Sequence, residues 1–188
     1  MRIISGTYKG LTLASVGKGD AAAHLRPTSD RVRESIFNLL QNGGYGNPVV
    51  GARVLDLFAG TGALGLEALS RGAQSVTFVD CGAKARGLIA RNIDLCKAVD
   101  NTTLVAKNAT RLGSNNNLPF DLVFADPPYG KNLGEAAFVS ALQGGWFCRE
   151  TLIVWEENAE KPAPPGFIKL DARRYGETWV NLMSVQEL

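Results

Sequence analysis

The chain has 188 residues, of which 45% are hydrophobic and 20% charged. This size and composition indicate one globular domain, or one domain with a small extension, and exclude a disordered or fibrous chain. No apolar stretch is long enough to span a bilayer and the first ten residues lack signal-peptide character, so we expect a cytoplasmic protein without a membrane partner. Three widely spaced cysteines and a single histidine argue against a disulfide framework and a histidine-rich metal site, and we predict no metal.

Charge is unevenly distributed along the chain, although the net charge is only +2. Residues 1–38 carry six basic and three acidic side chains, whereas the remainder is close to neutral. A basic N-terminal arm on a near-neutral body is compatible with an anionic macromolecular partner.

The N-terminal part differs in pattern from the rest of the chain. Its first expected elements are two short strands and a glycine-rich loop, over residues 2–4, 10–13 and 14–25. Thr28 or Ser29 then caps a helix whose apolar residues recur on one face. This apolar stripe consists of Val32, Ile36, Leu39 and Leu40. We therefore divide the chain into a small N-terminal extension of hairpin, loop and helix, residues 1–45, and a main domain, residues 46–188.

In the main domain, apolar runs alternate with helical stretches. The expected strands are Arg53–Leu57, Ser75–Val79, Thr103–Ala106, Phe120–Ala125 and Leu152–Glu156. The expected helices between them are Ala63–Arg71, Ala83–Cys96 and Leu133–Leu142. Such alternation predicts an α/β fold with a doubly wound, mostly parallel sheet. Residues 167–175 and 178–186 form a C-terminal hairpin that adds an antiparallel edge. Ligands of such sheets bind at the carboxyl ends of the strands.

A glycine-rich loop follows the first of these strands. Gly60, Gly62 and Gly65 satisfy the G-x-G-x-x-G pattern, which is shared by many nucleotide binders and also describes a tight turn without a ligand. The carboxylate of Asp56 at the strand end would repel the pyrophosphate of a dinucleotide but attract a cation. S-adenosylmethionine carries an ammonium and a sulfonium. The segment from Asp56 to Gly62, with Phe58 and Ala59 before the first glycine, resembles the first motif of class I methyltransferases.

Two further strand ends complete a candidate cofactor site. Asp80 ends the second strand, 20 residues after Gly60, where it could accept hydrogen bonds from both ribose hydroxyls. The alternative for Asp80 is a cap of the following helix. After the third strand, Asn108 and Ala109 would face the adenine, although asparagine is also a common turn former.

The most specific segment of the chain is Asp126-Pro127-Pro128-Tyr129, after the fourth strand. Two prolines stiffen this loop and remove N–H donors from it, so that it presents acceptors. The Asp126 carboxylate and the Pro127 carbonyl could accept both N–H groups of an exocyclic amine and direct its lone pair at the methyl donor. The Tyr129 ring could stack on the base. Asp-Pro-Pro-Tyr resembles the catalytic motif of amino-methyltransferases that act on nucleobases or glutamine amides.

The N-terminal segments narrow this resemblance to one family. Met1–Gly10, Leu25–Asn38 and Ala63–Gly72 are similar to the bacterial 16S ribosomal RNA guanine-N2 methyltransferase family, and the similarity covers nearly the whole chain. It implies a class I, Rossmann-like catalytic domain that uses S-adenosyl-L-methionine, releases S-adenosyl-L-homocysteine and methylates one guanine amine of small-subunit rRNA in a partly or fully assembled subunit. The family more often has Glu at the position of Asp80 and Asp at that of Asn108.

The resemblance also suggests a role for exposed basic side chains. The candidates for contacts with RNA phosphates are Arg2, Lys9, Arg26, Arg31, Arg33 and Lys131. The alternative for each is a solvated surface charge, and the segment from Thr28 to Arg33 could instead order around the cofactor. We expect a monomer, because no apolar pattern requires a partner surface.

Three other functions are alternatives to the methylation of guanine. Methylation of adenine N6 in DNA would retain both motifs, but the chain has little room for a target-recognition domain. A catalytically silent RNA-binding assembly factor would not need an intact Asp126 and glycine loop. An NAD-dependent oxidoreductase is disfavoured by Asp56.

Overall fold

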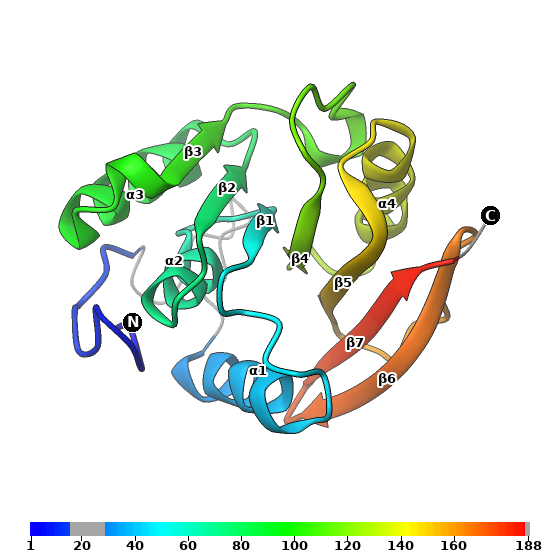
Figure 1. The fold of residues 1–188 in the computed structure, drawn as a ribbon, viewed down its shortest axis with the longest axis horizontal. Coiled ribbons are helices and arrows are strands. Elements are labelled where there is room, and N and C mark those ends of the chain that lie inside the picture. Colours follow the sequence, from blue (N-terminus) through cyan, green and yellow to red (C-terminus); the bar gives the residue numbers. More distant parts are fainter. Residues whose placement is uncertain (16–28, 187–188) are drawn as a thin grey trace.

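The computed structural model describes residues 1–15 and 29–186 (Figure 1). In this part of the chain seven strands form one sheet in the order β3-β2-β1-β4-β5-β7-β6. Their bounds are β1 Arg53–Leu57, β2 Ser75–Val79, β3 Thr102–Val105, β4 Phe120–Ala125, β5 Phe147–Glu157, β6 Phe167–Tyr175 and β7 Thr178–Val185. Strands β1 to β5 are parallel, whereas β7 runs antiparallel to both β5 and β6. The predicted mostly parallel sheet with an antiparallel C-terminal hairpin is confirmed.

Helices cover both faces of the sheet. The longer ones are α1 Asp30–Asn42, α2 Ala63–Ser70, α3 Ala83–Cys96 and α4 Leu133–Gln143; the short turns are η1 Val99–Asn101 and η2 Ala109–Arg111. One hydrophobic cluster joins α1, α2 and α3 to the sheet, and a second joins α4 and η2 to its other face. Because side chains alternate along a strand, successive residues of β1, β4 and β5 contribute to different clusters.

Helix α1 lies against the sheet beside β4. Its N-cap is Ser29, whose hydroxyl accepts a hydrogen bond from the Val32 N–H (3.2 Å), and its C-cap is Gly43. Phe37 is fully buried, and its ring centroid lies 5.5 Å from that of Phe124 in β4. Phe37 thus joins Ile36 and Leu40 on the buried face, whereas the predicted stripe residues Val32 and Leu39 are only partly buried. The alternative cap Thr28 lies outside the described residues.

The two N-terminal segments pair in the expected antiparallel way: a bridge joins Arg2 and Thr12, and the N–H groups of Ile3 and Leu13 donate to the carbonyls of Leu11 (2.9 Å) and Met1 (3.1 Å). The expected hairpin pairing is therefore present, but it is too short to form regular strands. The backbone of this segment also bonds to a buried side chain of α2: Glu67 accepts from the N–H groups of Ile4 (2.7 Å) and Ser5 (3.0 Å). The helix thus holds the outer edge of the hairpin, while the Ile3 N–H and carbonyl pair across it with Leu11 and Gly10.

Other differences from the expected elements are small. Strand β5 begins at Phe147 rather than at Leu152, and β3 spans Thr102–Val105 rather than Thr103–Ala106. The added part of β5 contains the polar residues Arg149, Glu150 and Thr151, and its pairing with β4 is irregular, which apolar periodicity does not reveal. In the described residues, no helix has both the length and the apolar composition to cross a bilayer.

Candidate active site

The predicted acidic residues meet at one edge of the sheet. Asp56 lies in β1, and Asp80 and Asp126 come directly after β2 and β4. Strand β1 pairs with both β2 and β4, and Leu57 is in register with Val79 and Ala125. The carboxyl ends of three neighbouring strands therefore bring these side chains together, as parallel topology requires.

The glycine-rich loop turns sharply between β1 and α2. Phe58, Gly60 and Gly62 have positive φ angles of 58°, 60° and 76°. The Gly62 N–H donates to the Ala59 carbonyl (2.7 Å), and Gly62 is the N-cap of α2. A Cβ on Gly65 would lie 2.5 Å from the Phe78 ring, so glycine is required there for the close approach of helix and sheet.

Asp56 is almost completely buried, with 2% of its surface exposed. One carboxylate oxygen accepts a hydrogen bond from the Gly65 N–H at 2.9 Å. Burial raises the pKa of Asp56 well above its usual value, with Asp126 and Asp80 adding to the effect, while the Gly65 N–H opposes it. A cation bound nearby would favour the ionised carboxylate.

Asp80 organises the loop backbone. Its two oxygens accept hydrogen bonds from the N–H groups of Gly60 (2.9 Å) and Gly82 (2.8 Å). The N-cap of α3 is Gly82, without a side-chain cap bond, so Asp80 is not itself the cap. Each carboxylate oxygen has a second lone pair, and ribose binding by Asp80 remains a prediction.

Asn108 starts a 3₁₀ turn. Its side-chain oxygen accepts hydrogen bonds from the backbone N–H and the hydroxyl of Thr110, both at 2.9 Å, and the next residue, Ala109, is buried. Asn108 therefore forms a turn, as one of the two expectations held. A contact of Asn108 or Ala109 with adenine remains a prediction.

The Asp-Pro-Pro-Tyr segment leaves the sheet after β4 and leads toward α4. Asp126 and Tyr129 are partly exposed, whereas Pro127 is buried. A buried proline between the two candidate side chains holds the backbone of the corner, because its ring fixes φ and packs into the protein. The segment therefore presents the Asp126 side chain at the same edge as Asp56.

Two charged residues at this edge differ from the sequence-based predictions: Glu156 was not predicted to belong to the site, and Arg33 was predicted to contact RNA. Glu156, near the end of β5, is 2% exposed, and its Oε1 has no hydrogen-bond partner. Burial raises the pKa of Glu156 well above its usual value; Asp126 and Asp56 add to this, and Arg33 opposes it. A carboxylate at the end of an apolar strand, the signal used for Asp56, was present in the sequence at Glu156 as well.

Arg33 is fully buried in α1, which does not fit the predicted contact with an RNA phosphate. Its Nη2 donates to the Arg2 carbonyl (2.6 Å) and to Asp30 (2.7 Å), while Nε and Nη1 lack partners. Burial lowers the pKa of Arg33, although the carboxylates of Asp30, Glu67 and Glu156 oppose this.

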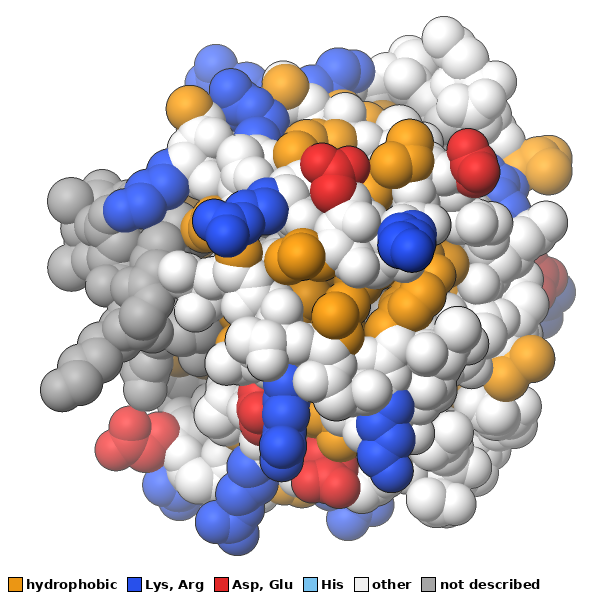
Figure 2. All heavy atoms as spheres, turned by 90° about the vertical axis from the view of Figure 1, so that its left-hand side faces the viewer, with side chains coloured by type: hydrophobic (Ala, Val, Ile, Leu, Met, Phe, Trp, Pro, Cys, Tyr) orange, Lys and Arg blue, Asp and Glu red, His pale blue; other side chains and the backbone are white. Residues whose placement is uncertain are grey.

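The other candidate RNA contacts are exposed where the structure describes them: Arg2, Lys9, Arg31 and Lys131. Arg26 lies outside the described residues. Figure 2 shows the side of the molecule that carries α3, β3 and the N-terminal segment, where basic side chains lie above and below a group of hydrophobic ones. RNA binding by the exposed residues remains a prediction.

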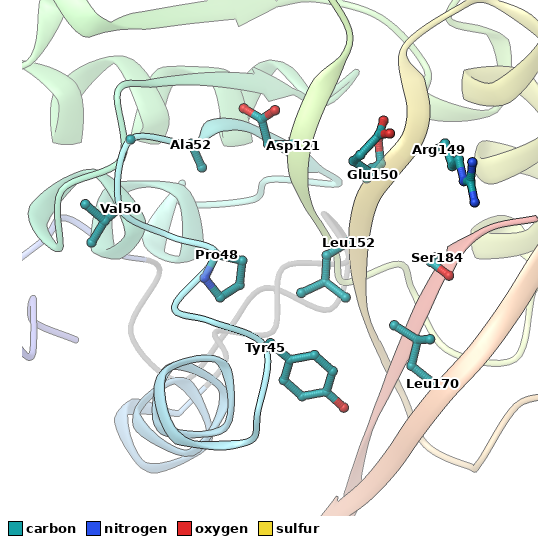
Figure 3. Close-up of a pocket in the computed structure, with 12 residues that line it drawn as sticks. Tyr45, Pro48, Val50, Ala52, Asp121, Arg149, Glu150, Leu152, Leu170 and Ser184 are labelled. Atoms are coloured by element: carbon teal, nitrogen blue, oxygen red, sulfur yellow. The ribbon is translucent and has the colours of Figure 1, made fainter.

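A cavity of about 590 Å³ lies at the opposite edge of the sheet (Figure 3). Among its lining residues, Ala52, Asp121 and Arg149 lie at or near the amino ends of β1, β4 and β5. Parallel sheets bind ligands at the other edge, so this cavity is separate from the candidate site. No group of His, Cys, Asp or Glu side chains in the described residues is arranged to hold a metal.

The sheet order and the two loops at its carboxyl edge define a class I methyltransferase fold. The solved structure of the Escherichia coli protein yhhF matches it with a TM-score of 0.80 and 33% identity, over 100% of this chain and 99% of that one. Magnesium protoporphyrin IX methyltransferase from Synechocystis, solved with bound SAM, matches with a TM-score of 0.61 and 16% identity, over 93% and 86% of the two chains, and shows the fold alone.

The family follows from sequence comparison. Ribosomal RNA small subunit methyltransferase D of Escherichia coli is 37% identical over 164 residues, which cover 87% of this chain and 78% of that protein. The chain belongs to the family described as Conserved hypothetical protein 95, whose model matches residues 1–184. The family resemblance carried by the N-terminal segments is confirmed.

Proposed function

We propose that the protein is an S-adenosyl-L-methionine-dependent methyltransferase that methylates the exocyclic N2 amine of a guanine in 16S rRNA. The observation that carries this proposal is the position of Asp126-Pro127 at the same sheet edge as Asp56 and the glycine loop. The name of the Escherichia coli relative supports an rRNA of the small subunit as the substrate. The partner is then a partly or fully assembled small subunit, in the cytoplasm.

The residues at the carboxyl edge fit the cofactor. Asp56 and Asp80 offer carboxylate acceptors, which suit an ammonium, a sulfonium and ribose hydroxyls and would repel a pyrophosphate. A Cβ on Gly62 would come within 3.2 Å of the Phe78 ring in addition to facing an unfavourable φ, so the loop is kept free of a side chain there. Asp56 and the glycine loop would hold the methionine end, and Asp80 the ribose. The bound cofactor supplies an electrophilic methyl group.

The chain's own contribution is to position and activate the amine. Its lone pair is delocalised into the base and is a weak nucleophile. The Asp126 carboxylate and the Pro127 carbonyl accept its two N–H bonds, favour a pyramidal nitrogen and direct the lone pair at the methyl. The Tyr129 ring stacks on the base. Once alkylated, the nitrogen becomes acidic, and Asp126 or water takes the proton.

The test is to identify the methylated nucleoside. The protein is incubated with methyl-labelled S-adenosylmethionine and small subunits from a strain that lacks the corresponding enzyme, and the rRNA is digested to nucleosides. Label in N2-methylguanosine supports the proposal. Label in N6-methyladenosine would favour the second amino-methyltransferase function, and absence of label with tight RNA binding would favour a silent assembly factor.

A further inference from the structure

A buried asparagine joins the N-terminal segment, residues 1–15, to the glycine loop. Asn92 lies in α3 and is completely buried. Its amide nitrogen donates to the carbonyl of Thr61 (2.8 Å), between Gly60 and Gly62, and to the carbonyl of Ala14 (3.0 Å). Its amide oxygen accepts from the Ala14 N–H at 2.7 Å. One side chain therefore satisfies backbone groups of two segments far apart in the sequence.

The Thr61 carbonyl belongs to a peptide unit that is held at both ends. Its oxygen accepts from Asn92, and its N–H, that of Gly62, donates to the Ala59 carbonyl (2.7 Å). This peptide lies in the left-handed part of the loop, where glycine gives little steric restriction. Asn92 is thus the side chain that fixes the orientation of a peptide which sequence alone leaves free to turn.

The N-terminal segment has independent anchors that do not touch the loop. The Ser70 hydroxyl accepts from the Tyr8 N–H (2.9 Å) and donates to the Ser5 carbonyl, and Glu67 accepts from two further N–H groups. The same segment carries the exposed Arg2 and Lys9. Loss of an anchor can therefore be separated from loss of the link to the loop.

We propose that Asn92 is a positioning residue that holds the N-terminal segment and the cofactor loop as one unit, so that binding of the cofactor tightens the segment. This inference rests on the proposed function, because it takes the glycine loop as the cofactor site. By linkage, whatever orders the segment also favours the cofactor-binding form of the loop.

The test compares Asn92→Leu, Asn92→Ala and Ser70→Ala. Leucine has the γ-branched shape of asparagine, although it is larger, and removes all three hydrogen bonds without leaving a cavity, whereas alanine removes the same bonds and leaves one. Ser70→Ala loosens the same segment and leaves the Thr61 carbonyl bonded. Binding of S-adenosylhomocysteine is measured by calorimetry, amide exchange of residues 1–15 by mass spectrometry, and folding by urea denaturation.

We expect S-adenosylhomocysteine to slow amide exchange of the N-terminal segment in the unaltered protein and in Ser70→Ala. The effect should be several-fold smaller in either Asn92 variant, where the weaker contact of the Thr61 hydroxyl with the Met1 sulfur (3.8 Å) remains. Both Asn92 variants should bind the ligand about tenfold more weakly, because the loss of one to two hydrogen bonds leaves the loop less ordered before binding. They should also raise KM for S-adenosylmethionine more than they lower kcat. Ser70→Ala should bind it as the unaltered protein does.

Equal weakening in Ser70→Ala and Asn92→Leu, or normal affinity in a folded Asn92→Leu, would overturn the proposal. Weakening confined to Asn92→Ala would assign the effect to the cavity and would also overturn it. A failure of the proposed cofactor site is distinguishable, since the unaltered protein would then not bind S-adenosylhomocysteine; a different methylated base would leave this binding test unchanged.

Discussion

The carboxylate of Asp80 accepts a 2.9 Å hydrogen bond from the Gly60 N–H, which ties the end of β2 to the loop that follows β1. The next residue, Cys81, is exposed, so a thiol stands beside the proposed ribose site. The other two cysteines serve as internal references: Cys148 is half-buried, and Cys96 is buried, which raises the pKa of its thiol to about 11.

We expect iodoacetamide to alkylate Cys81 first and Cys96 only on unfolding, because thiolate character and access control the rate. Saturating S-adenosylhomocysteine should slow alkylation of Cys81 several-fold and leave Cys148 unaffected. Peptide mapping by mass spectrometry gives both rates. An unchanged rate at Cys81 in the presence of bound ligand would mean that the ribose lies elsewhere.

Gly65→Ala and Gly87→Ala form a matched pair of helix substitutions with opposite predicted effects. A Cβ at Gly65 would lie 2.5 Å from the Phe78 ring and 2.7 Å from Val76, and the variant should lose about 1–3 kcal/mol of unfolding free energy. At Gly87 a Cβ meets nothing within 4 Å, and alanine should add about 0.5–1 kcal/mol. Urea denaturation measures both; a stabilised Gly65→Ala would refute the close packing of α2 on β2.

The pH dependence of stability should change when Glu156 is replaced by glutamine. Burial, with Asp126 and Asp56, raises the pKa of native Glu156, while Arg33 lowers it. The native protein therefore binds this proton more tightly than the unfolded chain. The contribution of this bound proton to the free energy of unfolding is full below the usual carboxyl pKa, about 4.3. It is lost as pH rises through the native pKa.

Glutamine keeps a neutral, similarly sized side chain at all pH values. The unfolding free energy of Glu156→Gln, relative to the unaltered protein, should thus increase as pH rises through that range. Urea denaturation at a series of pH values measures the difference. Parallel curves for the two proteins would show that the pKa of Glu156 is the same in the native protein as in the unfolded chain.

Substitutions of Arg33 and Lys9 should distinguish a basic residue with a structural role from one that binds RNA. Arg33→Ala removes a buried guanidinium that bonds to Arg2 and Asp30, and should cost about 3 kcal/mol of stability. Lys9→Ala should leave stability unchanged and make the slope of log affinity for RNA against log salt concentration shallower by about 0.9, the value for one neutralised phosphate. Thermal unfolding and filter binding at several salt concentrations test the pair. Normal stability of Arg33→Ala would contradict its structural role.

Sequence periodicity predicted the central sheet because buried parallel strands are short apolar runs between helices. The bounds of β1, β2 and β4 and of α3 were correct. The pairing of the N-terminal hairpin was also found, but its attachment to α2 was not, since further backbone donors bond to Glu67 and Ser70 across more than 60 residues of sequence. Local pattern carries no information on such partners.

The candidate site, like the fold, could be predicted from the sequence only in part. Strand-end carboxylates could be found from sequence, because topology alone brings them to one edge. The burial of Arg33 could not be predicted, since an arginine on a helix is usually exposed and this one bonds to the carbonyl of Arg2, 31 residues away. Asn92 carries no local signal either, because both backbone segments that it bonds are distant in sequence.

The most direct test of the central claim is the rate of methyl transfer to small subunits by Asp126→Asn, compared with Asp94→Asn on the exposed surface of α3. An asparagine at position 126 offers a weaker acceptor of similar shape, so we predict a rate about 100- to 1,000-fold lower with the affinity for S-adenosylhomocysteine within a few-fold of normal; Asp94→Asn should be unaffected. Near-normal transfer by a folded Asp126→Asn would contradict activation of the amine by this carboxylate.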